Sequence, residues 1–221
     1  MQRDIFILSN NDWDDYWFQR QQFAVEFAKR GARVFFFNKT LTKMPKLGNI
    51  VKGKYRKNSR GYVRNVIPDN ITVVTPVWLP PLRILRPINR WLIIRTLKSL
   101  KYSSPITLVY TPTYNSMDLL QMVKPRISAY INVHNFEAFD VINDMLISEI
   151  EIINKVDFLF ADSTFNQKRL RGKLNDLGKP VLMSPPGVDV SSFAKICVLL
   201  SRKDHLLFLD TKSDTYELIG I

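Results

Sequence analysis

Residues 4–37 read DIFILSNNDWDDYWFQRQQFAVEFAKRGARVFFF, and this stretch decides the predicted fold. The apolar run 4–9 indicates a buried first strand. Residues 16–30 predict a helix, because aromatic and alanine side chains recur there at helical spacing, and Gly31 is a natural stop. A second apolar strand follows at 33–37. A strand, a helix and a strand within about 35 residues predict the βαβ unit of a doubly wound parallel sheet.

The rest of the chain continues this alternation, which predicts an α/β fold: a Rossmann-like, doubly wound, mainly parallel sheet in a single domain. The pair of runs at 62–67 and 71–75 leaves two alternatives open, a hairpin or an added edge strand. Further strands are predicted at 106–110, 128–133, 156–161 and 181–183, and helices at 82–101, 116–123, 142–155 and 165–174.

Length and composition limit the class of protein. A chain of 221 residues, 46% of them hydrophobic, has room for one well-buried core and is too short for two such domains. The single Cys197 excludes an internal disulfide and fits a reducing compartment. The first residues carry charges where a signal peptide needs an apolar core, and no run of 18 apolar residues occurs. We therefore expect a cytoplasmic protein, either free or peripherally held at the inner face of the cell membrane.

The chain is strongly basic. It has 32 Lys and Arg against 20 Asp and Glu, a formal net charge of +12, which favours anionic partners. Residues 39–64 contain nine basic residues and no acidic one, and residues 83–101 are also free of acids. The segment 39–60 has no apolar periodicity and is predicted to be a loop, either bordering an acceptor site or simply solvated.

The predicted helix 82–101 is basic and amphipathic. Two alternatives remain: a membrane-surface helix, or a crossover helix with its apolar side buried on the sheet and its charges in water. The predicted apolar side consists of Leu85, Ile88, Trp91, Leu92, Leu97 and Leu100.

The turn after the first strand is polar and aromatic, and it has none of the glycine patterns that hold dinucleotides or nucleoside triphosphates. In an open parallel sheet, ligands bind beyond the carboxyl ends of the strands, where this turn must lie. Trp13 is a candidate for stacking on a sugar face, with amide and carboxylate groups for its hydroxyls. The alternative is that Asp12 or Asp14 caps the following helix while Trp13 covers the helix end. The candidate acceptor-binding residues are Asn10, Asn11, Asp12, Trp13 and Arg20.

Two later turns add candidates. His134 lies just past a predicted central strand, which is a catalytic position by geometry, although a lone histidine is more often a structural residue. Glu137 and Asp140 are nearby alternatives. Ser163 is predicted to cap the next helix, and its hydroxyl, with the helix N-terminus, can also face an anion.

Residues 180–193, PVLMSPPGVDVSSF, hold the most specific motif. The run ends in two prolines, which cannot continue a sheet, and then in Gly187. Gly187, Val188, Asp189 and Phe193 resemble the Gly-Val-Asp-x-x-x-Phe signature at the junction between the two domains of GT-B glycosyltransferases of the retaining family 4 group. The spacing of Trp13, Arg20 and Gln22 is similar to a bacterial branch of that family, which includes teichuronic-acid and capsule transferases.

The resemblance covers residues 1–193 and implies a GT-B N-terminal, acceptor-side domain. It implies catalytic roles for His134 and Glu137 at the interdomain cleft, with Ser163, Gly187, Val188 and Asp189 lining the cleft and junction. The donor-binding domain, with its Glu-x-x-x-x-x-x-x-Glu motif, has no match, so residues 194–221 are expected to be a linker or the shortened start of that domain.

The expected function is transfer of a sugar from a nucleotide sugar to a polysaccharide or lipid-linked acceptor, inactive without a donor domain on another chain. The expected partners are the nucleotide-sugar donor, the saccharide or lipid-linked acceptor, an anionic membrane surface and a separate donor-domain chain. Nucleic acid is not expected, since no recognisable nucleic-acid module is present. No cofactor and no metal are expected. A non-catalytic acceptor- or membrane-binding module is the alternative.

Overall fold

The computed structural model describes residues 3–39, 67–79, 82–138, 143–174 and 178–185. The chain divides into two units, Met1–Pro185 and Pro186–Ile221, and the second lies entirely outside the described residues. The predicted domain end at residue 193 and the predicted linker 194–221 therefore lie outside them too. The strands are β1 Asp4–Leu8, β2 Arg33–Phe37, β3 Ile71–Val74, β4 Ile106–Val109, β5 Ile127–Asn132, β6 Phe158–Ala161 and β7 Val181–Met183. The helices are α1 Gln19–Lys29, α3 Arg86–Lys98, α4 Tyr114–Val123, α5 Asn143–Lys155 and α6 Thr164–Lys173, with short 3-10 turns η2 Arg83–Leu85 and η3 Phe136–Ala138.

The seven strands form one sheet in the order β3-β2-β1-β4-β5-β6-β7, and every neighbouring pair is parallel. This confirms the predicted Rossmann-like doubly wound α/β fold. β3 pairs in parallel with β2 at the edge of the sheet, so the added edge strand is confirmed and the hairpin was wrong for this strand. The other half of that alternative, 62–66, lies outside the described residues.

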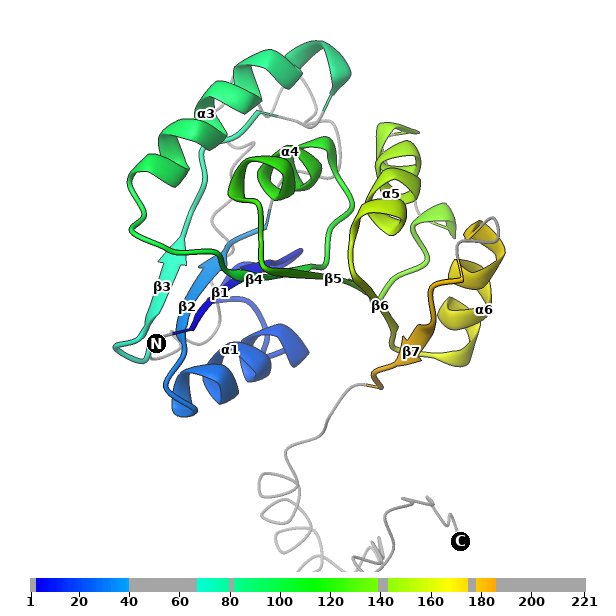
Figure 1. The fold of residues 1–221 in the computed structure, drawn as a ribbon, viewed down its shortest axis with the longest axis horizontal. Coiled ribbons are helices and arrows are strands. Elements are labelled where there is room, and N and C mark those ends of the chain that lie inside the picture. Colours follow the sequence, from blue (N-terminus) through cyan, green and yellow to red (C-terminus); the bar gives the residue numbers. More distant parts are fainter. Residues whose placement is uncertain (1–2, 40–66, 80–81, 139–142, 175–177, 186–221) are drawn as a thin grey trace, which may run out of the picture. The chain divides into compact units, whose positions relative to one another are not determined.

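Helices cover both faces of the sheet, and two hydrophobic clusters mark the faces. Figure 1 shows α1 on one side and α3, α4 and α5 on the other. The larger cluster joins one face of the sheet to side chains of α3, α4, α5 and α6. The smaller cluster joins the opposite face to α1, through Ala24 and Ala28. The two alanines let α1 pack closely on the strands.

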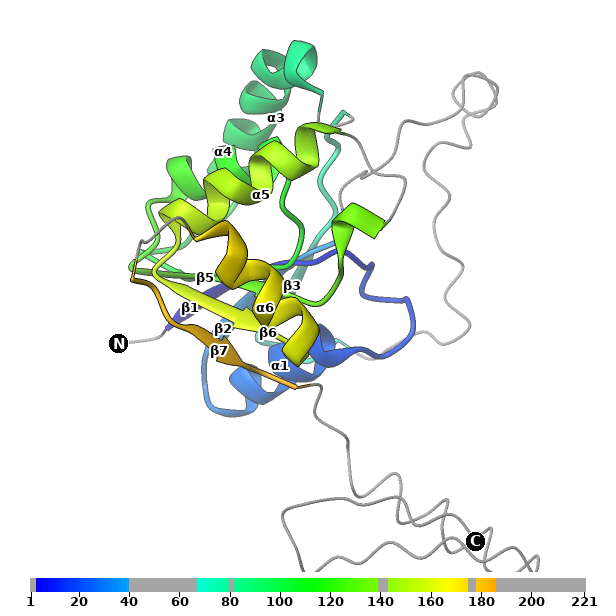
Figure 2. The same ribbon diagram turned by 90° about the vertical axis from the view of Figure 1, so that its right-hand side faces the viewer.

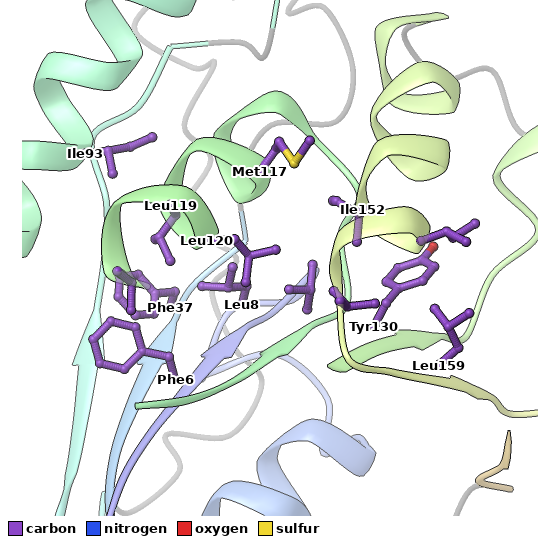
Figure 3. Packing of buried hydrophobic residues seen from close by; sticks show 14 of the residues in the cluster. Phe6, Leu8, Phe37, Ile93, Met117, Leu119, Leu120, Tyr130, Ile152 and Leu159 are labelled. Carbon is purple, nitrogen blue, oxygen red and sulfur yellow. The ribbon is translucent and has the colours of Figure 1, made fainter. Parts of the chain in front are cut away.

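The larger cluster contains Phe6 of β1 and Phe35 and Phe37 of β2, which point to the same face of the sheet. Phe6 makes an edge contact with Phe35 at a centroid distance of 5.1 Å and a tilted contact with Phe37 at 5.2 Å. Figure 3 shows Phe6 and Phe37 beneath Leu119 and Leu120 of α4. Side chains alternate between the two faces of a strand, so the central strands need apolar residues at every position. All five residues of β1 are buried accordingly.

Helix α1 begins later than predicted, at Gln19 instead of residue 16. The side chain of Gln21 accepts a hydrogen bond from the backbone N–H of Phe18 at 3.2 Å and so satisfies the start of the helix. Neither Asp12 nor Asp14 caps it, and that alternative was wrong. The turn after β1 is thereby three residues longer than predicted, which leaves more chain beside the carboxyl ends of the strands.

The predicted apolar side of the helix near residue 90 was partly wrong. Leu92, Leu97 and Leu100 pack against the core as predicted. In contrast, Ile88 and Trp91 are 50% and 58% exposed. The sequence places two apolar stripes on this helix, and the prediction merged them. The buried stripe is completed by Asn89 and Ile93. The side-chain amide of Asn89 accepts a hydrogen bond from the backbone N–H of Leu79 and donates one to the carbonyl of Leu79.

Candidate functional site

The candidate site lies at the carboxyl ends of the strands, where β1 and β4 are neighbours. From β1 the chain continues to β2 and β3 on one side of β1, whereas from β4 it continues to β5, β6 and β7 on the other side. The direction in which successive strands are added therefore reverses between β1 and β4. Loops that follow two such strands diverge to opposite faces of the sheet, and this is where open α/β sheets bind ligands. In Figure 2 the chain leaving β1 toward α1 can be followed at this edge.

The loop after β1 is fixed by its own side chains. Ser9 Oγ accepts a hydrogen bond from the N–H of Asn11 at 3.0 Å. Asp12 lies 3.2 Å from the ammonium of Lys39, and its N–H donates to Asp15. Asp12 therefore ties the loop to the end of β2, and its carboxylate is engaged by Lys39.

Trp13 is not available to a sugar. Its side chain is 1% exposed and packs edge-on against Phe36 and Trp17, at centroid distances of 5.1 and 5.7 Å. Its backbone N–H donates a hydrogen bond to Asn38 Oδ1 at 2.8 Å. The prediction that Trp13 stacks on a sugar face was wrong, because the indole completes the core beneath the loop.

Arg20 is the most unusual residue of the site. It is only 4% exposed, although arginine is seldom buried without an ionic partner. Its Nη1 donates to Asn11 Oδ1 at 2.6 Å, and its guanidinium lies 5.2 Å from the ring centres of both Phe18 and Tyr110. Burial lowers the pKa of Arg20 to about 10, against an attractive contribution from Tyr110. Arg20 is therefore still charged at neutral pH.

Tyr110 was not among the predicted residues. It directly follows β4, is fully buried, and joins Arg20 across the point where the strand order reverses. Burial raises the pKa of Tyr110 well above its ordinary value, so the phenol keeps its proton. Its place at the end of the apolar run 106–110 was the signal that could have identified it.

His134 follows β5 at the same edge. Its carbonyl accepts a hydrogen bond from Asn132 at 3.0 Å, and its ring meets that of Phe136 edge-on at 5.8 Å. Burial lowers the pKa of His134, and so does the charge of Arg20, whereas Asp162 opposes them. The imidazole is therefore neutral at pH 7, and it is electrostatically coupled to residues from the β1 and β6 ends of the site.

Glu137 belongs to a different group of residues. Its carboxylate forms salt bridges with Lys173 and, at 3.5 Å, with Arg169. The hydrogen bond from Lys173 lowers the pKa of Glu137 in spite of some desolvation. As a carboxylate already engaged by two cations, Glu137 is a poor general base. The other alternative, Asp140, lies outside the described residues.

A buried charge network near Glu137 was missed by the sequence analysis. Glu149 is fully buried, accepts from Arg169 at 2.7 and 2.9 Å and from Lys173 at 2.6 Å, and also accepts from Tyr130 at 2.7 Å. Burial alone raises the pKa of Glu149, but the bonds from Arg169 and Lys173 outweigh it and leave the pKa below its ordinary value. The signal was an acid on the otherwise apolar side of α5, one turn after Met145.

The predicted cap at Ser163 is confirmed. Its Oγ accepts from the N–H of Asn166 at 3.3 Å at the start of α6. Beside it, Asp162 accepts from the side chain of Asn166 at 2.8 Å. The junction residues Gly187, Val188 and Asp189 lie outside the described residues. Just before them, the amide of Gln19 on α1 reaches the Ser184 carbonyl at 3.4 Å, which ties the end of the described chain to the site helix.

Buried polar atoms without a hydrogen-bond partner gather at this edge. In native proteins such atoms are few, and each calls for an explanation, such as a bound ligand or water. Those that follow the carboxyl ends of β1, β4, β5 and β6 are Asn10 Oδ1, Tyr110 OH, Thr111 Oγ1, Asn115 Oδ1, Asn132 Oδ1 and Asn166 Oδ1, together with Arg20 Nε. This set suits a polyhydroxylated ligand, since its amide oxygens can accept from hydroxyl groups and its own hydroxyls can both donate and accept.

Within the described ranges, no three His, Cys, Asp or Glu side chains gather where they could hold a metal ion. Over the same residues, no helix is both long and apolar enough to cross a membrane. Comparison of the chain with protein-family models and with curated proteins finds no match. The functional assignment therefore depends on the site itself and on the sequence motifs.

Proposed function

We propose that this chain is the acceptor-side domain of a GT-B glycosyltransferase, which transfers a sugar from a nucleotide sugar to a polysaccharide or lipid-linked acceptor. The observation that carries the proposal is the set of buried polar atoms without partners at the carboxyl edge of the sheet, where β1 and β4 meet. Asn10, Asn11 and Arg20 contribute from one side of this point, and Tyr110 contributes from the other. The resemblance of the Gly187-Val188-Asp189 segment to the GT-B interdomain junction supports the same assignment.

His134 has the protonation state that such a role requires. As a neutral imidazole it can accept a hydrogen bond from an acceptor hydroxyl and donate one from its other nitrogen. In a retaining transfer, the donor diphosphate leaves on the face that the acceptor hydroxyl attacks, and the hydroxyl proton passes toward the leaving group. The chain's part is to orient the acceptor. The leaving group requires positive charge, which we assign to a donor-binding domain.

The test is nucleotide-sugar turnover by the chain mixed with a candidate donor-domain chain. We expect turnover only in the mixture, and we expect His134→Ala to reduce it by about 100-fold or more, a typical loss for a positioned hydrogen-bonding or proton-transfer group. Arg30→Gln is the matched control, since Arg30 is exposed just after the last turn of α1, away from the site. Sugar binding without turnover in any mixture would favour the non-catalytic acceptor-binding module. The absence of both binding and turnover would refute the transferase and the acceptor-binding module alike.

A second function is favoured by α3. The outer side of α3 and of the preceding turn η2 presents four large apolar side chains to solvent: Ile84 of η2 (83% exposed), and Ile88, Trp91 and Ile94 of α3. The guanidinium of Arg95 lies 5.7 Å from the Trp91 ring centre, and Arg90 and Lys98 are also exposed. We call this set the α3 stripe. Apolar side chains interleaved with cations, with no acidic residue between 83 and 101, suit the surface of an anionic membrane.

We propose that the α3 stripe docks the domain on anionic lipid, beside a lipid-linked acceptor. Each cation near an anionic leaflet contributes about 1 kcal/mol, so binding should fall as salt rises. Sedimentation with anionic phosphatidylglycerol vesicles tests this proposal, and zwitterionic phosphatidylcholine vesicles are the comparison. We expect weaker binding to the phosphatidylcholine vesicles. The double variant Ile88→Ser, Trp91→Ser should lose binding. The control is Ile147→Ser, Ile150→Ser on α5, two residues of similar exposure. Equal loss in both double variants would contradict the proposal.

A further inference from the structure

Four cations of this domain other than Arg20, each partly exposed to a different degree, are paired with carboxylates. Arg33 donates two hydrogen bonds to Asp4, at 2.8 and 2.9 Å. Arg86 donates to both oxygens of the fully buried Asp118. Arg169 and Lys173 share Glu149. Such pairing is expected, because an uncompensated charge loses several kcal/mol of hydration in a protein interior.

Arg20 departs from this rule. At 4% exposure it is more deeply buried than these four cations, yet over the described residues no carboxylate lies within salt-bridge distance of it. The acids nearest to it in sequence are engaged elsewhere, since Asp12 and Asp15 lie 3.2 and 3.5 Å from the ammonium of Lys39. The guanidinium therefore enters the site with its charge uncompensated.

The contacts that Arg20 does make position it and leave one of its edges without a hydrogen-bond partner. Asn11 takes Nη1, and the rings of Phe18 and Tyr110 flank the guanidinium group. Nε is buried and has no hydrogen-bond partner. Arginine commonly binds carboxylate or phosphate through two parallel N–H groups on one edge, and the Nε edge is the one left for this. Tyr110, whose ring centre lies 5.2 Å from the guanidinium carbon, has a hydroxyl that is also buried and without a partner, and this hydroxyl is a further donor.

We propose that Arg20 binds an anionic group of the substrate, a carboxylate or a phosphate, through its unpaired Nε edge, with Tyr110 as a second donor. This inference rests on the proposed function in taking the carboxyl edge as the substrate site. It adds that the substrate held there is acidic, as an acidic sugar or a phosphate-linked saccharide is. An anion at this point supplies the negative charge that the four cations named above obtain from carboxylates of the chain.

The test is a titration of the full chain, in which the side-chain Nε–Hε resonance of Arg20 in proton–nitrogen spectra reports binding. The probes are inorganic phosphate, glucuronate and, as the neutral control, glucose. We expect phosphate or glucuronate to shift the Arg20 resonance with a Kd in the millimolar range, typical of fragments that make one bidentate contact. A response to phosphate alone would assign a phosphate-linked substrate, and a response to glucuronate alone would assign an acidic sugar. Glucose should not shift this resonance.

Two variants complete the test. Arg20→Lys keeps the charge but loses the two-pronged edge, so it should weaken anion binding by about tenfold or more. Arg30→Gln should bind as the parent does. The wild-type titration does not depend on either variant folding. The inference would be overturned if the Arg20 resonance stayed unshifted with both anions. It would also be overturned if a folded Arg20→Lys protein bound the anions as tightly as the parent.

The outcomes also separate this inference from the proposed function. Anion binding without nucleotide-sugar turnover in any mixture would keep the anion site and refute the transferase. Turnover on neutral acceptors, with no effect of Arg20→Lys, would keep the transferase and refute the anion site.

Discussion

Replacement of Glu149 by glutamine should destabilise the domain more than any other single charge removal in the Glu137–Glu149 network. Glutamine has the same shape but no charge, so Arg169 and Lys173 lose the buried carboxylate on which both converge. Breaking a buried ion pair by removing one partner costs about 3–5 kcal/mol. Because Glu137 still contacts both cations, we expect the lower end, about 3 kcal/mol. For a domain of this size that corresponds to a fall in Tm of roughly 6–12 °C.

Urea unfolding at pH 7, followed by circular dichroism, measures this effect. The matched control is Glu137→Gln, which removes a carboxylate from the same two cations, but one whose side chain is 45% exposed. Exposed ion pairs contribute about 0–1 kcal/mol, so the control should stay within that range. Equal losses in the two variants, or a loss below about 1 kcal/mol for Glu149→Gln, would refute the reasoning that burial sets the strength of this network.

The pH dependence of unfolding gives an independent check on the same residue. The pKa of Glu149 is held below its ordinary value of 4.5 in the folded chain. A lowered carboxylate pKa contributes stability that is present above the unfolded pKa and is lost as pH falls through the folded one. The parent should therefore lose stability below about pH 4.5 more steeply than Glu149→Gln, which has no such carboxylate to protonate.

Three further predictions concern single residues. His134 should titrate with a midpoint below 6.5 in proton NMR spectra, and Arg20→Gln should raise that midpoint by removing the nearby charge; a midpoint above 6.5 would contradict the burial seen here. Thr113→Ala should cost about 1 kcal/mol in denaturant unfolding, because Thr113 Oγ1 accepts from the N–H of Ser116 at the start of α4; no change would mean that this cap contributes nothing. Gly31→Ala should also destabilise the chain by about 1 kcal/mol, because Gly31 has φ of +79°, where a Cβ is strained although space is open; equal stability of the two proteins would refute this.

The fold was predictable from the sequence because apolar periodicity is a strong local signal. Residues 181–183 form β7 as predicted, and 142–155 and 165–174 form α5 and α6 to within one residue. The start of α1 was less predictable, since it depends on the side chain of Gln21 and not on periodicity.

The site was harder to predict, because it depends on which residues meet across the sheet. Asn11 and Arg20 were identified from the first loop, and the structure brings them together. The roles of Tyr110 and Glu149 depend on partners far away in the sequence, and no local pattern reveals such partners. Trp13 was misplaced for a related reason: an aromatic residue in a polar turn gives no sign of whether its ring points to solvent or into the core.

The pairing of β1 with β4 has a consequence for how the chain folds. It places Ile5 beside Ile106 and Leu8 beside Val109, residues about a hundred positions apart. Contacts of such long sequence separation require a large loop to close and form slowly. Arg20 meets Tyr110 only after this step, so a partly folded chain lacks the site. A ligand that contacts residues following both strands would stabilise the β1–β4 pairing against opening. It should therefore slow hydrogen exchange in β1 and β4 together.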